Sequence, residues 1–252
     1  MIGIYFSGTG NTKHCVEVFF NNYQNTNMCF PIEDKKVIEA IKQADAICFG
    51  YPVYFSNAPK IVKDFIANNK ELWLGKKIFV IATMERFSGD GSGYLARLLK
   101  QQGAIIVGGM HIKMPNSIGD QKVLRKSLED NKQMVKKAED KIIQVARFLH
   151  AGKQYKEGLG VFSHILGLLG QRLWFYNKTK HYSNKVKINN KCIGCRKCAI
   201  LCPMHNITIE NNKAVCKSHC TMCYRCVNHC PKQAITLLGS TVHGQSTIEK
   251  YV

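Results

Sequence analysis

The stretch IGIYFSGTGNTK, residues 2–13, decides the fold of the N-terminal half of this 252-residue chain. A short apolar run is followed at once by a loop of small residues and then by a stretch with helical character over 11–22. Backbone N–H groups at the start of such a helix point into the space above the sheet edge, which makes the loop a candidate anion site. Hydroxyl and amide donors surround two glycines there, at Ser7, Gly8, Thr9, Gly10, Asn11 and Thr12. We predict that the loop holds a terminal phosphate, although tight Gly-Thr turns also serve as plain helix starts.

Apolar runs and amphipathic segments alternate through the first 150 residues. The strand-like runs occupy 2–6, 46–50, 77–83 and 104–109, with a weaker one at 28–31. This rhythm predicts a parallel sheet covered by helices on both faces, and five strands fit a doubly wound α/β sheet of order 2-1-3-4-5. Apolar residues at helical intervals from Asp120 to Leu149 predict a closing helix that ends near Gly152.

Two further loops leave the same carboxyl edge of the predicted sheet, GYPVYFSNAP at 50–59 and TMERFSGDGSG at 83–93. Ligands of open α/β sheets bind at this edge, near the point where the strand order reverses. The loops offer flat apolar side chains and polar edge partners, at Tyr54, Phe55, Ser56, Asn57, Thr83, Phe87, Ser88, Gly89 and Asp90. A planar, phosphorylated ring system fits such a site, whereas the alternative places these aromatic residues in the core below the loops.

The segment SGTGNT at 7–12 resembles the FMN-phosphate loop of flavodoxins, and the resemblance covers residues 1 to about 150. It implies a flavodoxin-like fold and bound FMN, with the phosphate on the first loop. It further implies that the isoalloxazine ring is lined by Pro52, Tyr54, Phe55, Asn57, Thr83, Met84, Phe87, Ser88, Gly89, Asp90 and Gly91. The chain lacks the insertion of long-chain flavodoxins, and it is basic where typical flavodoxins are acidic.

Eight of the twelve cysteines lie in a sequence motif that occurs twice, as CIGCRKCAILCPMHNITI from residue 192 and as CTMCYRCVNHCPKQAITL from residue 220. Both copies read CxxCxxCxxxCP followed by an Ile-Thr-apolar strand, which indicates a duplication. Three sulfurs at a spacing of three can surround an iron–sulfur cubane. Two zinc knuckles are the alternative, because CxxC pairs also bind zinc.

This region resembles the bacterial-type ferredoxins that hold two [4Fe-4S] clusters, across residues 185 to 240. In that pattern the fourth cysteine of each copy binds the other cluster. One cluster is therefore assigned to Cys192, Cys195, Cys198 and Cys230, and the other to Cys220, Cys223, Cys226 and Cys202. A module of this size has little apolar core, so we expect the clusters to supply much of its folding energy.

The formal net charge of +19 is spread along the chain. We divide the chain into a flavodoxin-like domain (1–150), a connector (151–184) and a ferredoxin domain with a tail (185–252). The connector carries an apolar stripe from Leu159 to Tyr176 that is too short to span a bilayer. It predicts either a helix that docks the domains together or a basic amphipathic contact with a membrane surface. The start of the chain does not read as a secretory leader, so we expect a cytoplasmic protein with reduced cysteines.

The whole chain resembles the flavodoxin-ferredoxin fusion proteins of anaerobic bacteria. The resemblance implies electron transfer between FMN and two clusters, with redox partner proteins that carry acidic docking surfaces. An alternative is an FMN-dependent reductase or oxidase of a small ring, of quinone, flavin or porphyrinogen type; no general acid or base stands out to support it. A third hypothesis, a nucleic-acid or membrane-binding module with structural clusters, is disfavoured because lysines and acids interleave at 123–141. We therefore expect no nucleic-acid partner.

Overall fold

The computed structural model describes residues 1–24, 28–87, 89–169, 173 and 184–252. A five-stranded parallel sheet forms the centre of the N-terminal part, in the predicted order β2-β1-β3-β4-β5. Its strands are β1 (Ile2–Tyr5), β2 (Cys29–Pro31), β3 (Ala46–Pro52), β4 (Lys77–Met84) and β5 (Ile105–Lys113). The predicted α/β fold class and strand order are therefore confirmed.

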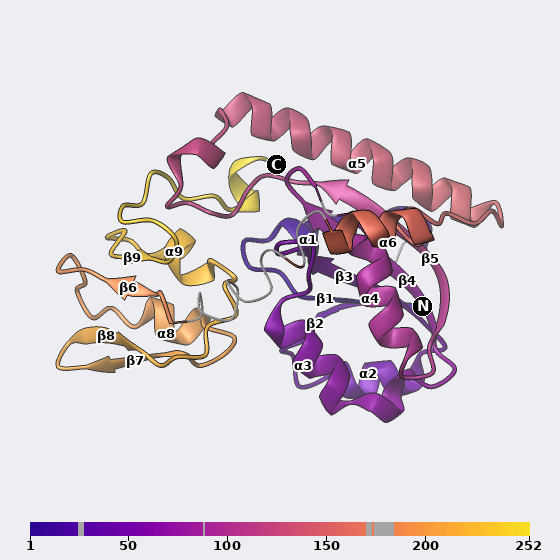
Figure 1. Ribbon diagram of the computed structural model, residues 1–252, viewed down its shortest axis with the longest axis horizontal. Coiled ribbons are helices and arrows are strands. Elements are labelled where there is room, and N and C mark those ends of the chain that lie inside the picture. Colours follow the sequence, from indigo (N-terminus) through magenta and orange to yellow (C-terminus); the bar gives the residue numbers. More distant parts are fainter. Residues whose placement is uncertain (25–27, 88, 170–172, 174–183) are drawn as a thin grey trace.

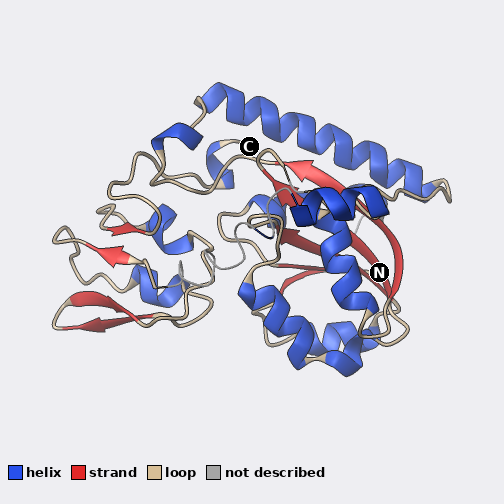
Figure 2. Ribbon diagram, viewed as in Figure 1, coloured by secondary structure: helices blue, strands red, loops and turns tan. Residues whose placement is uncertain are grey.

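Helices cover both faces of this sheet (Figures 1 and 2). One face packs against α1 (Asn11–Tyr23) and α5 (Leu128–His150). The other packs against α2 (Val37–Gln43), α3 (Lys60–Asn68), the short 3-10 helix η1 (Lys70–Trp73) and α4 (Gly91–Lys100). Successive side chains of β4 point to opposite faces of the sheet. Phe79 and Ile81 pack in the layer of α1 and α5, and Val80 and Ala82 pack in the layer on the other face.

Strand β5 runs four residues past its predicted end. The predicted strand stops at the Gly108-Gly109 pair, yet β5 continues to pair with β4 as far as Lys113. A side chain at Gly108 would meet the carbonyl oxygen of Tyr155, so its absence lets residues 155–157 run beside the sheet edge. Gly109 N donates to Tyr155 O (2.9 Å), and Glu157 N donates to Gly109 O (2.9 Å).

The closing helix α5 begins at Leu128, eight residues later than predicted. Ser127 caps it by accepting a hydrogen bond from Asp130 N. Residues before it form a 3-10 turn, η2 (Lys122–Leu124). The helix ends at His150, as predicted, and Gly152 follows with a φ of 73°.

Part of the predicted connector helix is present as α6 (Val161–Gly167). Its exposed apolar side chains are Val161, Phe162 and Ile165, and Leu169 and Leu173 beyond it are also exposed. The rest of the predicted stripe lies at 170–172 and 174–176, outside the described residues. Among the helices that are described, none has the length and apolar character needed to cross a bilayer. The predicted membrane-surface contact stays a prediction.

The C-terminal part repeats one small motif. Its helices are α8 (Lys197–Leu201) and α9 (Arg225–His229), and its strands are β6 (Lys187–Ile188), β7 (Ile207–Glu210), β8 (Lys213–Cys216) and β9 (Ile235–Thr236). The two helices start at equivalent positions of the two cysteine motifs. Each follows a residue with left-handed backbone, Arg196 (φ 65°) or Tyr224 (φ 59°). The duplication is therefore visible in the backbone.

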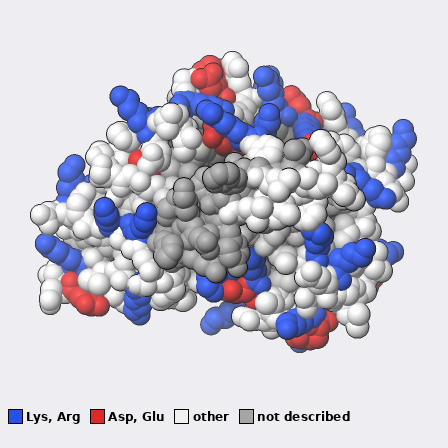
Figure 3. Space-filling view, viewed as in Figure 1, with Lys and Arg blue, Asp and Glu red and all other residues white. Residues whose placement is uncertain are grey.

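The last segment of the chain returns to the sheet domain. Its 3-10 turn η4 (Ile248–Lys250) lies at the start of α1. Ile248 N donates to Thr9 O (3.0 Å), and the Ile248 side chain belongs to the apolar layer of α1 and α5. On the face drawn in Figure 3, Lys and Arg side chains are scattered over both parts, as the sequence predicts.

Candidate functional site

The loop between β1 and α1 leaves several polar groups without partners. Gly10 precedes α1 with a φ of 90°, and no side chain caps the helix, so first-turn N–H groups remain available. Ser7 Oγ and Asn11 Oδ1 are buried without any hydrogen-bond partner. Buried polar atoms are rarely left unpaired, so these two indicate a ligand with both acceptor and donor groups.

A pocket opens directly above this loop, with about 770 Å³ of empty space that is partly open to solvent. The structure brings ten of the predicted residues together around it: Ser7, Gly8, Thr9, Asn11, Thr12, Pro52, Tyr54, Phe55, Thr83 and Met84. Thr12 Oγ1 and Thr83 Oγ1 share a hydrogen bond of 2.8 Å that joins the first and third loops.

A tight turn carries the aromatic wall of the pocket. Tyr54 and Asn57 pair through two backbone hydrogen bonds of 2.9 and 3.0 Å. The central residues, Phe55 and Ser56, have φ values of 52° and 56°, which only glycine or asparagine adopts readily. Such strain is characteristic of functional sites. Burial raises the pKa of Tyr54 well above its ordinary value, so the phenol stays protonated.

The third predicted loop contributes less than expected. Phe87 and Gly89 line a neighbouring groove instead of the pocket, and Ser88 lies outside the described residues. Three predicted residues of the other two loops also do not line the pocket. Ser56 is fully buried in the turn, and Asn57 Oδ1 accepts a hydrogen bond from Ala58 N (2.9 Å). Gly10 lies behind the first loop against Ile248. The chain at 91–93 reads as a glycine-rich loop, but it is the first turn of α4.

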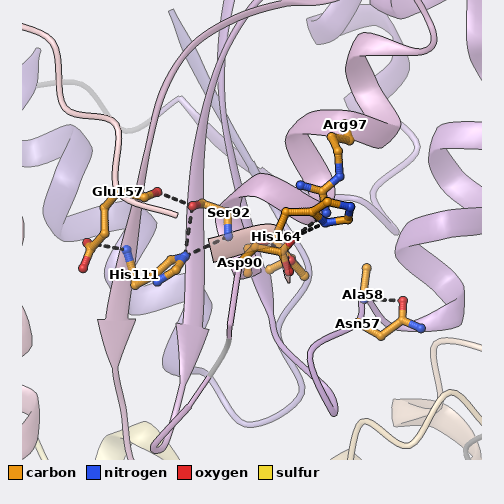
Figure 4. Close-up of polar contacts among 10 residues, drawn as sticks. Asn57, Ala58, Asp90, Ser92, Arg97, His111, Glu157 and His164 are labelled. Atoms are coloured by element: carbon orange, nitrogen blue, oxygen red, sulfur yellow. Dashed lines mark hydrogen bonds and ion pairs between the residues drawn. The ribbon is translucent and has the colours of Figure 1, made fainter. Parts of the chain in front are cut away.

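Asp90 and Gly91 lie under α6 and away from the pocket. Asp90 is fully buried and pairs with Arg97 and with His164 Nδ1 (3.1 Å; Figure 4). The carbonyl oxygen of Gly91 accepts a hydrogen bond from Tyr51. The structure therefore does not bring these two residues to the pocket, because their polar groups are used in packing α4 and α6.

A second polar cluster in Figure 4 joins Ser92, His111 and Glu157. His111 Nε2 lies 3.1 Å from Ser92 N and 3.0 Å from Ser92 Oγ, while Glu157 accepts from the backbone N of His111 (2.9 Å). Burial lowers the pKa of the His111 imidazole, which keeps it neutral. Together with the hydrogen bond from Ser92 Oγ to Glu157 O, these contacts attach residues 155–157 to the sheet.

Sequence reasoning missed a wall of the pocket that follows β5. It consists of Met114, Pro115, Asn116, Ser117 and Ile118. Asn11 Nδ2 donates to Pro115 O (2.7 Å), which fixes this segment to the phosphate loop. The rule that ligands bind at the carboxyl ends of strands could have identified it. Val53 and Glu85, which adjoin predicted residues, also line the pocket.

The C-terminal part contains two smaller cavities, each lined by one of the predicted cysteine quartets. The larger, of about 420 Å³, is lined by Cys202, Cys220, Cys223 and Cys226. The other, of about 350 Å³, is lined by Cys192, Cys195, Cys198 and Cys230. We call them the inner and the outer thiol cavity. Among the described residues, no three His, Cys, Asp or Glu side chains group closely enough to hold a single ion.

Backbone N–H groups point at the sulfurs in matching positions of the two copies. Asn206 N donates to Cys202 Sγ and Ala234 N to Cys230 Sγ, both at 3.3 Å. Burial raises the pKa of Cys220 to about 11 and of Cys223 to about 12. These thiols therefore stay protonated by themselves, and only a bound metal makes them thiolates at neutral pH.

The inner thiol cavity adjoins the pocket of the sheet domain. The Tyr224 side chain lines both, and Met222 lines the pocket. A side chain at Gly8 would clash with the carbonyl oxygen of Cys223, so glycine lets the phosphate loop contact this cysteine directly. Sequence patterns could not have identified Met222 and Tyr224 as pocket residues, because they belong to the other part of the chain.

Buried polar contacts fix this junction. Asp120, 2% exposed, accepts hydrogen bonds from Tyr224 Oη (3.0 Å) and from the backbone N–H groups of Leu237, Leu238 and Gly239 (2.6, 2.9 and 3.0 Å). On the other side, Arg225 Nη2 donates to Ser7 O (2.8 Å) and to Glu33 Oε1 (2.7 Å).

Comparison with known families agrees with both sites. The flavodoxin domain family matches residues 2–104, and the 4Fe-4S dicluster domain family matches residues 184–231. The chain is thus a flavodoxin–ferredoxin fusion protein. The matched families imply FMN in the N-terminal domain and iron–sulfur clusters in the C-terminal one, which defines an FMN and iron–sulfur electron-transfer protein.

Solved structures similar to this chain include flavodoxins. The two-electron reduced flavodoxin of Megasphaera elsdenii is 22% identical over 46% of this chain and 89% of its own, with a TM-score of 0.41. A flavodoxin from the domain Archaea is 17% identical over 58% and 95%, with a TM-score of 0.40. Rubredoxin oxygen:oxidoreductase from Desulfovibrio gigas is 16% identical over 58% and 35%, with a TM-score of 0.39. Among curated proteins, none matches significantly.

Proposed function

We propose that this protein couples two-electron and one-electron carriers by passing electrons between FMN and two [4Fe-4S] clusters. FMN exchanges one or two electrons, whereas each cluster passes one at a time. The phosphate would be held by the loop from Ser7 to Thr12, and the ring by Tyr54, Phe55 and the segment after β5. The inner cavity would hold the cluster of Cys202, Cys220, Cys223 and Cys226, and the outer cavity that of Cys192, Cys195, Cys198 and Cys230.

One observation carries this proposal: Tyr224 lines both the flavin pocket and the inner thiol cavity. The direct contact of Gly8 with Cys223 supports it further. Electron transfer needs cofactors in close proximity, and here the protein excludes water between the two sites by burying Met222 and Tyr224. The unpartnered Ser7 Oγ and Asn11 Oδ1 fit a phosphorylated, hydroxyl-bearing ligand.

The test begins with protein purified without oxygen. We expect one FMN and roughly eight iron and eight sulfide per chain, the content of two cubanes. Rapid mixing with a reductant should bleach flavin and clusters in coupled phases, and Cys195→Ala should uncouple an external acceptor from the flavin. Zinc as the sole metal, or transfer unchanged in Cys195→Ala, would contradict the proposal.

A groove beside the flavin pocket favours a second candidate function, reduction or oxidation of a small anionic ring at FMN. The groove shares Met84 and Glu85 with the pocket. Its basic side chains outnumber its acidic ones and are Arg86, Lys113, Lys126, Lys137 and Lys141. Steady-state turnover of quinone, flavin and porphyrinogen substrates separates this activity from pure electron carriage. The cytoplasmic location, an anaerobic source and the absence of a nucleic-acid partner stay predictions.

A further inference from the structure

The two copies of the cysteine motif can be compared position by position, because equivalent residues are 28 positions apart in the sequence. In the second copy, one face of the cluster loop is covered by the flavodoxin domain. In the first copy, no described residue of the flavodoxin domain covers the equivalent face. The corresponding pairs are Ile193 and Thr221, Arg196 and Tyr224, Lys197 and Arg225, and Ile200 and Asn228.

Each of these residues of the second copy contacts the flavodoxin domain. Thr221 Oγ1 accepts a hydrogen bond from Ile61 N (3.2 Å), and Asn228 Nδ2 donates to Ser117 O (2.8 Å). Arg225 pairs with the Glu33 carboxylate, as described above. The second copy therefore uses an apolar and hydrogen-bonded centre with a cation–carboxylate pair beside it.

The first copy presents its counterparts to solvent. Ile193 is 58% exposed and Ile200 is 79% exposed. Arg196 and Lys197 are exposed beside them, and neither has an ion-pair partner among the described residues. Two exposed isoleucines flanked by cations have the composition of an interface, with an apolar centre and a charged rim.

The charge around the outer cavity has one sign. Residues 185–238 contain nine Lys and Arg and a single acidic residue, Glu210. Arg196, Lys197 and Lys232 line the outer cavity, and no carboxylate lines it. Lys197 occupies the position whose counterpart, Arg225, already pairs with a carboxylate of a flavoprotein domain. An acidic protein surface would supply that missing partner.

We propose that Ile193, Arg196, Lys197 and Ile200 form the docking site of a one-electron carrier protein with an acidic surface. This inference rests on the proposed function. One electron passes between the cluster of the outer cavity and the partner's redox centre, so that one is oxidised as the other is reduced, and no bond forms or breaks. The internal flavodoxin domain and the external partner thus approach the two clusters through equivalent faces of the repeat.

The test uses the full holoprotein and a plant-type [2Fe-2S] ferredoxin of net negative charge as the probe. With wild-type protein, we expect the second-order rate constant of electron exchange to fall as salt is raised. In the double variant Arg196→Glu and Lys197→Glu, this rate constant should be about tenfold lower at low salt, and it should no longer depend on the salt concentration. Ile200→Glu, added to the double variant, should lower the rate constant below that of the double variant.

Lys100→Glu is the matched control, because it makes a charge change of the same sign at the exposed end of α4. It should keep the wild-type salt dependence. Iron content and flavin-to-cluster equilibration should be unchanged in Lys100→Glu, and iron content is measured for every variant so that rate constants are compared per intact cluster. A rate constant in the double variant equal to that of Lys100→Glu would overturn the docking site. If electrons do not equilibrate between the flavin and the clusters in the wild-type protein, the proposed function is overturned instead.

Carbodiimide cross-linking gives a readout that does not depend on electron transfer. A cross-link between Lys197 and a carboxylate of the ferredoxin is the expected result. Cross-links confined to lysines of α5, or formed only between two copies of this chain, would contradict the proposal.

Discussion

The N-terminal domain encloses a large apolar layer on each face of its sheet, whereas the C-terminal domain has one cluster of nine buried side chains, one of which is the predicted ligand Cys198. The difference shows two ways to stabilise a fold within one chain. The sheet domain excludes water from side chains such as Phe49, Phe79 and Trp73. We expect the C-terminal domain to depend instead on bonds from cysteine to a metal cluster.

Removal of iron and sulfide should have the largest effect and should separate the domains. We expect amides of β6 to β9 to lose their protection from hydrogen exchange, while those of β1, β3 and β4 keep theirs, because the sheet does not need the clusters. The measurement is hydrogen exchange with mass spectrometry on protein before and after anaerobic chelation. Retained protection in the C-terminal domain would show that its apolar cluster suffices.

Truncation of one core side chain should give the reverse result. Phe79 is 1% exposed and stacks on Phe19 with ring centroids 5.5 Å apart. Phe79→Ala should lower the free energy of unfolding of the sheet domain by about 3–5 kcal/mol. Denaturant titration followed by far-UV circular dichroism measures this loss. Ile193→Ala is the control and should change it by less than about 0.5 kcal/mol, because that side chain is exposed.

Asp120→Asn tests the junction between the domains. The amide keeps one acceptor oxygen but loses the charge that attracts three backbone N–H groups and Tyr224 Oη. We expect a loss of about 1.5–3 kcal/mol and faster exchange of the Leu237, Leu238 and Gly239 amides. Asp140→Asn changes an exposed carboxylate on α5 and serves as the control. Equal exchange rates in the two variants would contradict the proposed junction.

Ser7→Ala tests the flavin pocket. Because Ser7 Oγ has no partner in the protein, its removal should leave the stability of flavin-free protein unchanged. It should weaken FMN binding by about tenfold, the value of one hydrogen bond to a charged group. Quenching of flavin fluorescence measures the dissociation constant. Ser218→Ala, at an exposed position of the C-terminal domain, should bind FMN like the wild-type protein.

The smallest expected effect concerns Glu157. Burial raises the pKa of this carboxyl, but hydrogen bonds from Lys141 Nζ (2.7 Å) and the backbone N of His111 outweigh that effect and hold it below the ordinary 4.5. A lowered pKa means that the contact stabilises the fold above pH 4.5 and that this contribution disappears as the pH falls through the lowered value. Glu157→Gln should therefore lower Tm slightly at pH 7. The difference should vanish in strong acid; a difference that grew there would contradict the ion pair.

Much of the fold could be predicted because local signals and tertiary structure agree. The apolar runs at 2–6, 46–50 and 77–83 predict strands, and the observed β1, β3 and β4 end within two residues of these bounds. Local signals failed where tertiary contacts decide. Strand β5 continues beyond Gly109 to Lys113 while residues 155–157 run beside the glycine pair, and Gly91 to Gly93 start a helix where Asp90 is buried beneath α6.

That the loop from Ser7 to Thr12 lines a pocket could be predicted, because one contiguous segment supplies both its glycines and its donors. The ring site could be predicted only in part. Its Tyr54 wall follows a strand, as expected, but Met222 and Tyr224 reach it from the other domain through contacts that no spacing encodes. Cysteine spacing also could not reveal that one cluster loop is covered and the other exposed.

The return of Ile248 to the beginning of α1 bears on any attempt to dissect the molecule. Residues 1–150 expressed alone would lack this isoleucine, leaving a gap in the apolar layer beside the loop from Ser7 to Thr12, and Thr9 O would lose its bond to Ile248 N. The isolated N-terminal piece would then bind flavin less well than the intact protein does. Covalent separation of the halves is therefore a perturbation of both, even though each half has its own fold.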